Sequence, residues 1–283
     1  MQELLYAHVH IPKTAGTTLI HLLRRNFFPR CMDVRPFEPS SNGILRAKDL
    51  RKSLRINPAL QCITGHSIRP NADLESIIPD IRYFTILRDP VKRFISAYLY
   101  LNDVMKQDLT FEQHLKSEQK RNIQTRWIAG VPDLDLAKSV LNERFCLVGR
   151  TDRLNEFILL LARQLQAYGF DPVYRSQNLA VNRGREKIDQ ARVLEQRYGA
   201  VIRKNNQLDV ELMNYLDTVI MPRQQKEYGA TLAADLTAFE NEIAVSRPPR
   251  LLPYLDYAIR KFYYDPIIGS IRLMNGMQYR GSF

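Results

Sequence analysis

The fold of this chain is set by one stretch near its start, LLYAHVHIPKTAGTTLIHLL (residues 4–23). Residues 4–11 are apolar and rich in β-forming side chains, which predicts a short buried strand. Residues 19–23 carry apolar side chains at helical spacing, which predicts the helix that follows. A strand, a loop and a helix in this order direct free backbone N–H groups at one point. The stretch therefore predicts an oxyanion site in the loop.

The loop contains small and hydroxylated residues with one lysine and one glycine. Lys13 supplies a mobile positive charge, and Gly16 lets the backbone approach a ligand closely. Thr17 and Thr18 are expected to cap the helix and to donate hydroxyl hydrogens. The candidate phosphate-binding residues are Lys13, Thr14, Ala15, Gly16, Thr17 and Thr18. The usual ATP or GTP loop has its lysine after the second glycine, which is not the order here. The alternative is a threonine-rich turn before an ordinary helix.

Length and composition are those of a water-soluble globular protein. The 283 residues suffice for one large α/β domain or one domain with a helical appendage, and hydrophobic residues make up 45% of them. No apolar run approaches the roughly 20 residues that span a bilayer. The first predicted strand begins too early to leave room for a signal peptide. We therefore expect a cytoplasmic protein, or one of the Golgi lumen if an N-terminal anchor has been removed.

The net charge and the cysteine spacing indicate which kinds of ligand the protein binds. A formal net charge of +11 predicts an anionic partner. Nucleic acid is one candidate, although no nucleic-acid motif accompanies the dispersed Lys and Arg residues. A polyanionic nucleotide, with or without an acidic glycan, accounts for the charge equally well. Cys62 and Cys146 lie in strand-like runs where buried free thiols are usual, and with Cys31 they show no zinc spacing. No metal site is expected.

A histidine follows the next predicted strand. Residues 28–43 contain several Pro, Ser and Asn residues and predict a loop, and residues 47–55 predict a short basic helix. Residues 60–64 predict a second strand, which ends in Gly65-His66. In a parallel sheet the carboxyl ends of such strands lie beside the phosphate loop. His66 is thus placed to act as general base on an acceptor hydroxyl, although a histidine bonded within a turn is the alternative.

The third predicted strand, residues 81–87, runs into RDPVKRFISAY (residues 88–98). Asp89 is a good helix N-cap and Pro90 suits the first helical position, so a helix is expected to begin here. Arg88 ends the strand, and Ser96 lies two turns into the helix. Both side chains are predicted to converge on one phosphate, with Arg88 forming bidentate bonds. The alternative is a capped helix with basic surface residues.

These motifs resemble those of one enzyme family. Pro-Lys-Thr-Ala-Gly-Thr-Thr after a strand resembles the 5′-phosphosulfate loop of sulfotransferases that use PAPS (3′-phosphoadenosine 5′-phosphosulfate), and the segment from Arg88 to Tyr98 resembles their 3′-phosphate site. Gly65-His66 is similar to the step that carries the base in the carbohydrate branch that includes heparan sulfate 2-O-sulfotransferase. That branch has a second histidine where this chain has Thr64.

The resemblance implies a fold and a reaction. The fold would be a P-loop kinase-like parallel α/β sheet flanked by helices, with at least four strands. The reaction would transfer a sulfuryl group from PAPS to an acceptor hydroxyl, with adenosine 3′,5′-bisphosphate as product and no metal. Lys13 would neutralise the bridging oxygen of the leaving phosphate, Arg88 and Ser96 would bind the 3′-phosphate, and His66 would take the acceptor proton.

The resemblance extends over residues 4–228. Residues 121–130, RNIQTRWIAG, resemble a family segment near the acceptor cleft, which makes Asn122, Gln124 and Arg126 candidate substrate-binding residues; a packing helix is the alternative. Residues 145–149 predict a fourth strand and residues 152–165 a helix. Asn182 and Arg183 lie in a basic loop that would close over the donor phosphates, or would simply carry surface charge.

The chain is expected to divide into a catalytic domain at 1–228 and a helical, basic and aromatic extension at 229–283. Apolar residues at helical spacing near residues 251–262 predict a helix that lies on a membrane surface, forms an oligomer contact or packs on the catalytic domain. The sequence does not determine the oligomeric state. Two other functions remain open: a P-loop nucleotide-dependent kinase and a non-enzymatic polyanion-binding protein. The acceptor is expected to be a glycan.

Overall fold

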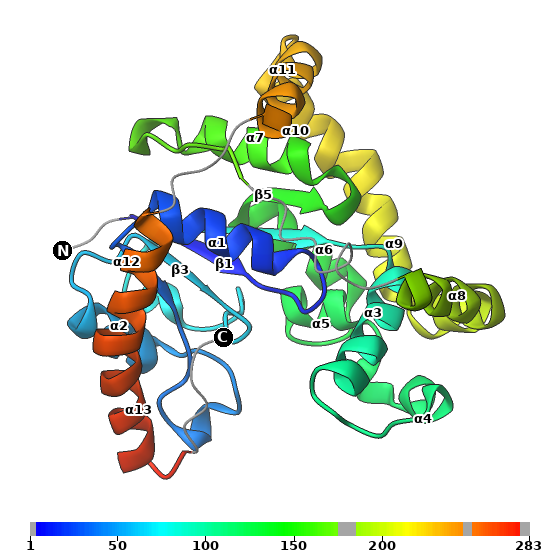
Figure 1. The fold of residues 1–283 in the computed structure, drawn as a ribbon, viewed down its shortest axis with the longest axis horizontal. Coiled ribbons are helices and arrows are strands. Elements are labelled where there is room, and N and C mark those ends of the chain that lie inside the picture. The colour runs from blue at the N-terminus through cyan, green and yellow to red at the C-terminus, as the bar shows by residue number, and fades with distance from the viewer. Residues whose placement is uncertain (1–3, 175–184, 246–250, 278–283) are drawn as a thin grey trace.

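The computed structural model describes residues 4–174, 185–245 and 251–277. Its centre is a five-stranded parallel sheet in the order β2-β3-β1-β4-β5 (Figure 1). The strands are β1 (Leu4–Val9), β2 (Cys31–Asp33), β3 (Cys62–Gly65), β4 (Asp80–Leu87) and β5 (Phe145–Arg150). The predicted parallel α/β sheet is therefore confirmed, with β1 in the middle.

The prediction that residues 28–43 form a loop is wrong in part. This segment contains β2 and a 3₁₀ turn, η1 (Pro39–Ser41). Cys31 of β2 lies opposite Cys62 of β3 in the sheet. Three residues carry little periodicity of their own, so β2 exists because β3 offers its backbone hydrogen bonds.

Helices cover both faces of the sheet (Figure 1). They are α1 (Gly16–Asn26), α2 (Ala47–Ile56), α3 (Pro90–Asp103), α4 (Phe111–Lys116), α5 (Ile123–Ala129), α6 (Leu134–Arg144), α7 (Leu154–Gln164), α8 (Arg185–Asn205), α9 (Gln207–Tyr215), α10 (Met221–Tyr228), α11 (Leu232–Val245), α12 (Leu251–Ile259) and α13 (Asp265–Met274). Two π-helical turns, η6 (Leu216–Ile220) and η7 (Arg260–Tyr264), join α9 to α10 and α12 to α13.

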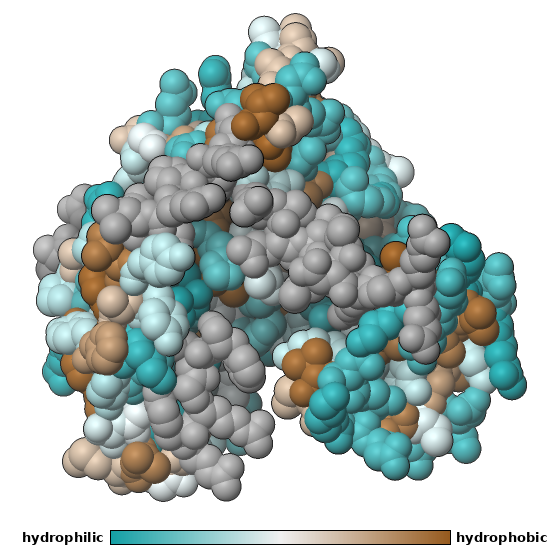
Figure 2. Space-filling model, viewed as in Figure 1, coloured by the Kyte–Doolittle hydropathy of each residue, from teal (hydrophilic) through white to brown (hydrophobic). Residues whose placement is uncertain are grey.

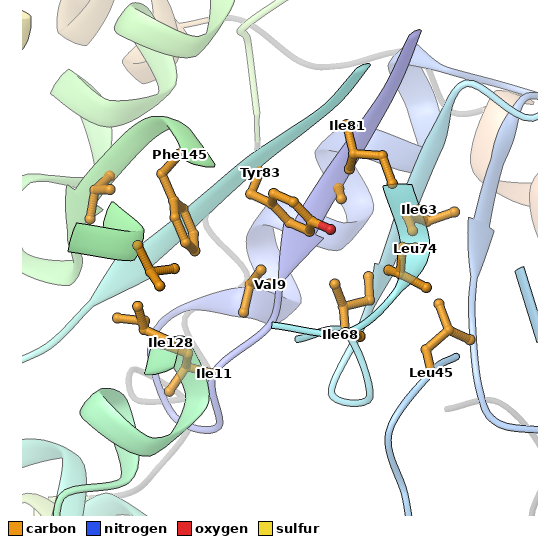
Figure 3. Packing of buried hydrophobic residues seen from close by; sticks show 14 of the residues in the cluster. Val9, Ile11, Leu45, Ile63, Ile68, Leu74, Ile81, Tyr83, Ile128 and Phe145 are labelled. Carbon is orange, nitrogen blue, oxygen red and sulfur yellow. The ribbon is translucent and has the colours of Figure 1, made fainter. Parts of the chain in front are cut away.

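Alternate residues of the strands supply two separate hydrophobic cores. Leu5, Ala7 and Val9 of β1 point into one core, which Figure 3 shows with Tyr83 and Phe145 of the neighbouring strands. Tyr6, which lies between Leu5 and Ala7, belongs to the opposite core, which contains side chains of α1 and α7. Because the sheet is buried on both faces, β1, β3, β4 and β5 are rich in apolar residues, and this explains why these four strands could be identified from sequence.

The outer edge of β5 is covered by a side chain of α10. The Gln224 amide donates from Nε2 to the Val148 carbonyl oxygen over 2.8 Å, and Oε1 accepts from the Val148 N–H over 2.9 Å. One side chain thereby satisfies both backbone groups that a further strand would pair with at this position.

The C-terminal helices pack on the domain that carries the sheet. Tyr264 is buried in the same core as β1, and its hydroxyl accepts a 2.9 Å hydrogen bond from the Asn57 amide. Other aromatic side chains of this segment are exposed, among them Tyr254 and Phe262. Figure 2 shows hydrophobic residues among polar ones along the side of the molecule that carries α12 and α13. None of the described helices combines the length and the apolar character that a membrane crossing requires.

Candidate active site

Three loops meet at the carboxyl edge of the sheet, after β1, β3 and β4. These strands are neighbours, with β1 between the other two. The loop after β1 contacts the loop after β3 through the His10 and His66 rings, whose centroids are 3.9 Å apart. It contacts the residue after β4 through a 3.0 Å hydrogen bond from Arg88 Nη1 to the Lys13 carbonyl oxygen. Three sequence motifs thus form one site at the place where ligands bind in parallel sheets.

The loop after β1 is held in an uncommon backbone conformation. Lys13 and Ala15 both have positive φ angles, 73° and 66°. Left-handed backbone in residues with a side chain costs on the order of 1–3 kcal/mol each, and such residues concentrate at ligand sites. The Thr14 hydroxyl donates to the Ile11 carbonyl oxygen over 2.9 Å, which fastens the loop to the end of the strand.

The expectation that Thr17 and Thr18 cap α1 is wrong. The helix begins at Gly16, its N-cap is Ala15, and no side chain makes a capping hydrogen bond there. Both threonines lie within the first turn, where Thr17 is exposed and Thr18 is buried. The first N–H groups of a helix have no partner within the helix. No side chain caps those of α1, so the first turn of this helix has the features of an oxyanion-binding helix N-terminus.

Lys13 lies against α3. Its Nζ is 4.2 Å from the centroid of the Tyr100 ring, a cation–π contact. Tyr100 and Ser96 are four residues apart on α3 and therefore share one face of that helix. The predicted start of α3 is confirmed, because the Asp89 carboxylate accepts from the Lys92 N–H over 2.9 Å and Pro90 is the first helical residue.

Arg88 is fixed through its backbone. The Gln124 amide accepts from the Arg88 N–H over 2.8 Å and donates to its carbonyl oxygen over 2.9 Å. Gln124 has no exposed surface. The sequence-based expectation that Gln124 contacts an acceptor is therefore replaced by a positioning role at the end of β4.

His66 follows β3 directly, as expected, and is exposed. Its Nδ1 is 2.7 Å from the His10 carbonyl oxygen. A carbonyl oxygen can only accept, so Nδ1 carries the hydrogen and the neutral ring keeps its lone pair on Nε2. Loss of water where the ring packs on its neighbours lowers the pKa of His66, and the charges of Arg69, Arg35 and Lys13 lower it further, against the opposing effect of the bond to His10.

A row of stacked rings extends from His66 into the sheet, which sequence reasoning missed. The His8 and His10 centroids are 5.3 Å apart, and His8 stacks in turn on Phe84 at 5.5 Å. His8 Nδ1 is 2.8 Å from the Thr64 hydroxyl oxygen. Thr64 therefore serves as the partner of His8. Burial lowers the pKa of His8 to about 3 and that of His10 well below its ordinary value, so both rings are neutral.

Arg69 holds the backbone after His66. Its Nη1 donates to the His66 carbonyl oxygen over 2.6 Å, and its guanidinium lies 3.9 Å from the Trp127 ring centroid. Burial lowers the pKa of Arg69 to about 10, so it is charged at neutral pH. With Arg35 and Lys13 it makes the surroundings of His66 electropositive.

Most of the segment 121–130 is the helix α5, which is fixed mainly by α9. The buried Asp209 carboxylate accepts from the Thr125 N–H and hydroxyl, each over 2.8 Å, and from the Gln124 N–H over 3.1 Å. Asn122 Oδ1 accepts from backbone N–H groups of α9, at Leu208 and Asp209. Asn122 therefore connects two helices.

Two predicted donor residues, Asn182 and Arg183, lie outside the described residues. Among the residues that are described, no cluster of three or more His, Cys, Asp or Glu side chains has the geometry of a metal site.

The sequence feature that could have pointed to the position of His10 is the glycine at position 16. A Cβ atom on this glycine would lie 1.9 Å from His10 Nε2, so the ring occupies the space that a side chain would need.

Comparison with known proteins gives a family match in the N-terminal part of the chain. Residues 2–131 match the model of the Sulfotransferase family. A sulfotransferase from Alicyclobacillus acidocaldarius matches in structure with a TM-score of 0.38 and 12% sequence identity, over 72% of this chain and 96% of that chain. No curated protein sequence matches the chain. The family match spans the loops after β1, β3 and β4 and supports sulfuryl transfer in general.

Proposed function

We propose that this protein transfers a sulfuryl group from PAPS to the hydroxyl of an acceptor. The proposal depends above all on the placement of His66. Its Nδ1–H is committed to the His10 carbonyl oxygen, and its Nε2 lone pair is left at the edge of the sheet beside the Lys13 loop. A base next to an oxyanion loop is what in-line transfer to a hydroxyl requires.

The donor would lie across the loops after β1 and β4. The uncapped first turn of α1 and the hydroxyls of Thr17 and Thr18 would hold the 5′-phosphate. Arg88 and Ser96 would hold the 3′-phosphate, Arg88 through charge-assisted bonds. The contact between Arg88 and Lys13 supports this arrangement because it keeps the two halves of the donor site together.

The reaction would be an in-line displacement at sulfur. The acceptor oxygen forms a bond to sulfur while the bond from sulfur to the bridging phosphate oxygen breaks, and that oxygen keeps the electron pair. Lys13 would stabilise the charge that develops on the bridging oxygen. His66 Nε2 would receive the proton from the acceptor hydroxyl. The products are the sulfate ester and adenosine 3′,5′-bisphosphate, and the step as written uses no metal.

We propose a carbohydrate acceptor, as in the heparan sulfate 2-O-sulfotransferase branch that the sequence resembles. Arg126 on α5 supports a polar acceptor, because its buried Nε has no hydrogen-bond partner among the described residues. The electropositive surroundings of His66 suit an acidic or hydroxyl-rich chain in preference to an apolar one.

Labelled PAPS tests the proposal directly. The protein is incubated with labelled PAPS and a panel of glycans and small hydroxyl compounds, in buffer with EDTA. We expect transfer to at least one acceptor, its abolition in Lys13→Ala, and normal transfer in Lys204→Ala, which changes an exposed lysine of α8.

A thermal-shift comparison separates the two other functions. PAPS should stabilise the fold, whereas ATP with Mg²⁺ should not. Stabilisation by ATP with phosphate transfer would show a kinase, and stabilisation by heparin alone without transfer would show a polyanion-binding protein. Either result would overturn the proposed function.

A further inference from the structure

The His10 ring lies between the donor loop and the proposed base. One face stacks on His66, with centroids 3.9 Å apart and ring planes inclined by 27°. The ring also closes on Gly16, the first residue of α1, so tightly that a Cβ atom there would lie within 1.9 Å of His10 Nε2. Only 9% of His10 is exposed.

His10 holds His66 in two ways at once. Its carbonyl oxygen accepts the His66 Nδ1–H over 2.7 Å, which determines the tautomer. Its ring face determines the plane in which the His66 ring lies, and therefore the direction of the Nε2 lone pair. The backbone bond needs no particular side chain at position 10, whereas the stack does.

The ring at position 10 must also remain neutral. Burial is the main reason that the pKa of His10 is lowered, and the charges of His66, His8 and Lys13 oppose its protonation as well. Arg69 and Arg35 add further positive charge around His66. A neutral flat ring excludes water from one face of His66 without adding a charge to this group.

We propose that His10 is the positioning residue of this site: its ring is the platform that orients His66 and that joins the base to the donor loop at Gly16. This inference rests on the proposed function, because it assigns His66 the role of base. His10 itself does not exchange a proton in the reaction. It fixes the tautomer and the plane of His66, and it keeps the loop and the base at a constant separation.

Substitutions at position 10 distinguish the contribution of the His10 ring from that of its backbone carbonyl oxygen. His10→Ala keeps the carbonyl oxygen and removes the platform, so water reaches the inner face of His66. We expect the pKa of His66 to rise toward its ordinary value and kcat to fall by about 10- to 100-fold, since small misplacements of a catalytic group cost this much. KM for PAPS should change less than about threefold, because the loop contacts to the donor remain.

His10→Phe is the matched variant, because it restores a flat ring without a titratable nitrogen. It should return kcat to within about threefold of the wild type and should lower the pKa of His66 again. A purely structural role for His10 would give parallel losses of kcat and melting temperature with an unchanged pH profile. If His10→Ala does not fold, His10→Leu fills the space without a flat ring; it should keep the pKa of His66 lowered while kcat falls as in His10→Ala, because the orientation of the His66 ring is lost.

The pKa of His66 is measured by NMR titration of its ring in the donor-free protein, so this readout does not depend on turnover. Absence of sulfuryl transfer by the wild type would reject the proposed function, while the titrations would still test the platform. An unchanged His66 pKa in His10→Ala, or a His10→Phe variant that behaves like His10→Ala, would overturn the inference about His10.

Discussion

The Arg88 guanidinium donates a 3.0 Å hydrogen bond to the carbonyl oxygen of Lys13. The two residues are far apart in sequence and belong to different motifs, one at the end of β4 and the other in the loop after β1. The bond helps to hold Lys13 in its left-handed backbone conformation. If one nucleotide binds across both motifs, its two phosphate groups meet residues whose separation is already fixed before binding, which lowers the entropy cost of binding.

The first prediction concerns donor recognition by Arg88. Arg88→Ala should weaken PAPS binding by about 10- to 100-fold, because charge-assisted hydrogen bonds contribute about 1.5–3 kcal/mol. Adenosine 5′-phosphosulfate lacks the 3′-phosphate, so its weaker binding should change by only a few-fold, through the lost support of Lys13. Isothermal titration calorimetry measures both ligands. Arg82→Ala, an exposed position earlier on β4, is the control. Equal losses for the two ligands would remove Arg88 from the 3′-phosphate site.

The second prediction concerns catalysis by His66. His66→Ala should lower kcat by roughly 10²–10⁴-fold and leave PAPS affinity nearly unchanged. The pKa of His66 is lowered, and only the neutral ring accepts a proton. The wild-type rate should therefore remain constant as the pH falls to 6.5 and decline only at lower pH. His21→Ala, at an exposed histidine of α1, should keep the wild-type profile. A near-normal kcat in His66→Ala would require another base.

The third prediction concerns the support of Arg88 by Gln124. In Gln124→Glu the buried side chain loses its donor and places a carboxylate against the Arg88 carbonyl oxygen. The free energy of unfolding should fall by about 1–3 kcal/mol, because a buried polar group is left unsatisfied. Urea unfolding measures the change. Gln107→Glu makes the same substitution at an exposed position and should have little effect. If the two variants were equally stable, Gln124 would not be holding the end of β4.

The elements that sequence predicted well are those with a strong local pattern. β1 and β4 are rich in apolar residues because both faces of the sheet are buried, and the start of α3 follows from Asp89 and Pro90 alone. β2 could not be found in this way, because a three-residue strand in a proline-rich segment exists only through its pairing with β3.

The site residues that sequence placed incorrectly depend on contacts between distant parts of the chain. His10 was assigned to the strand, but the structure places it beyond β1, against Gly16 and His66. Gln124 was expected at an acceptor surface and is buried against Arg88. A motif shows which residue types occur together in the sequence. It does not show which of them are buried or which residues they contact; for Gln124 these are decided by the packing of α5 on the end of β4.

The fourth prediction concerns acid sensitivity caused by His8. The unfolded chain binds a proton at His8 near pH 6.5, whereas the folded protein does so only near pH 3. The folded state therefore loses stability as the pH falls from 6.5 toward 3, by about 2 kcal/mol between pH 7 and pH 5 for this one group. His8→Phe keeps the stacking and removes the titration, so it should lose correspondingly less stability between these pH values.

Urea unfolding of the wild type and of His8→Phe at pH 7 and pH 5 provides the comparison. His8→Phe also loses the hydrogen bond to Thr64, which lowers the free energy of unfolding equally at both pH values. The informative quantity is therefore the change in the free energy of unfolding between pH 7 and pH 5. His21→Phe, at an exposed position, should retain the acid sensitivity of the wild type. The same pH dependence in His8→Phe and the wild type would show that His8 does not cause it.

The Gln224 amide that covers the edge of β5 has a consequence for how this protein aggregates when it is heated. An exposed strand edge is a template on which a second molecule can add a strand, and such edges start aggregation. Here two helices share the protection of β5: Gln224 of α10 bonds both backbone groups of Val148, and Gln164 of α7 donates to the Cys146 carbonyl oxygen. Detachment of α10 would leave the Val148 N–H and carbonyl oxygen unpaired at the edge of the sheet while the sheet is still intact. Aggregation under thermal stress is therefore expected to depend on how firmly α10 and α7 stay docked, in addition to the melting of the sheet itself.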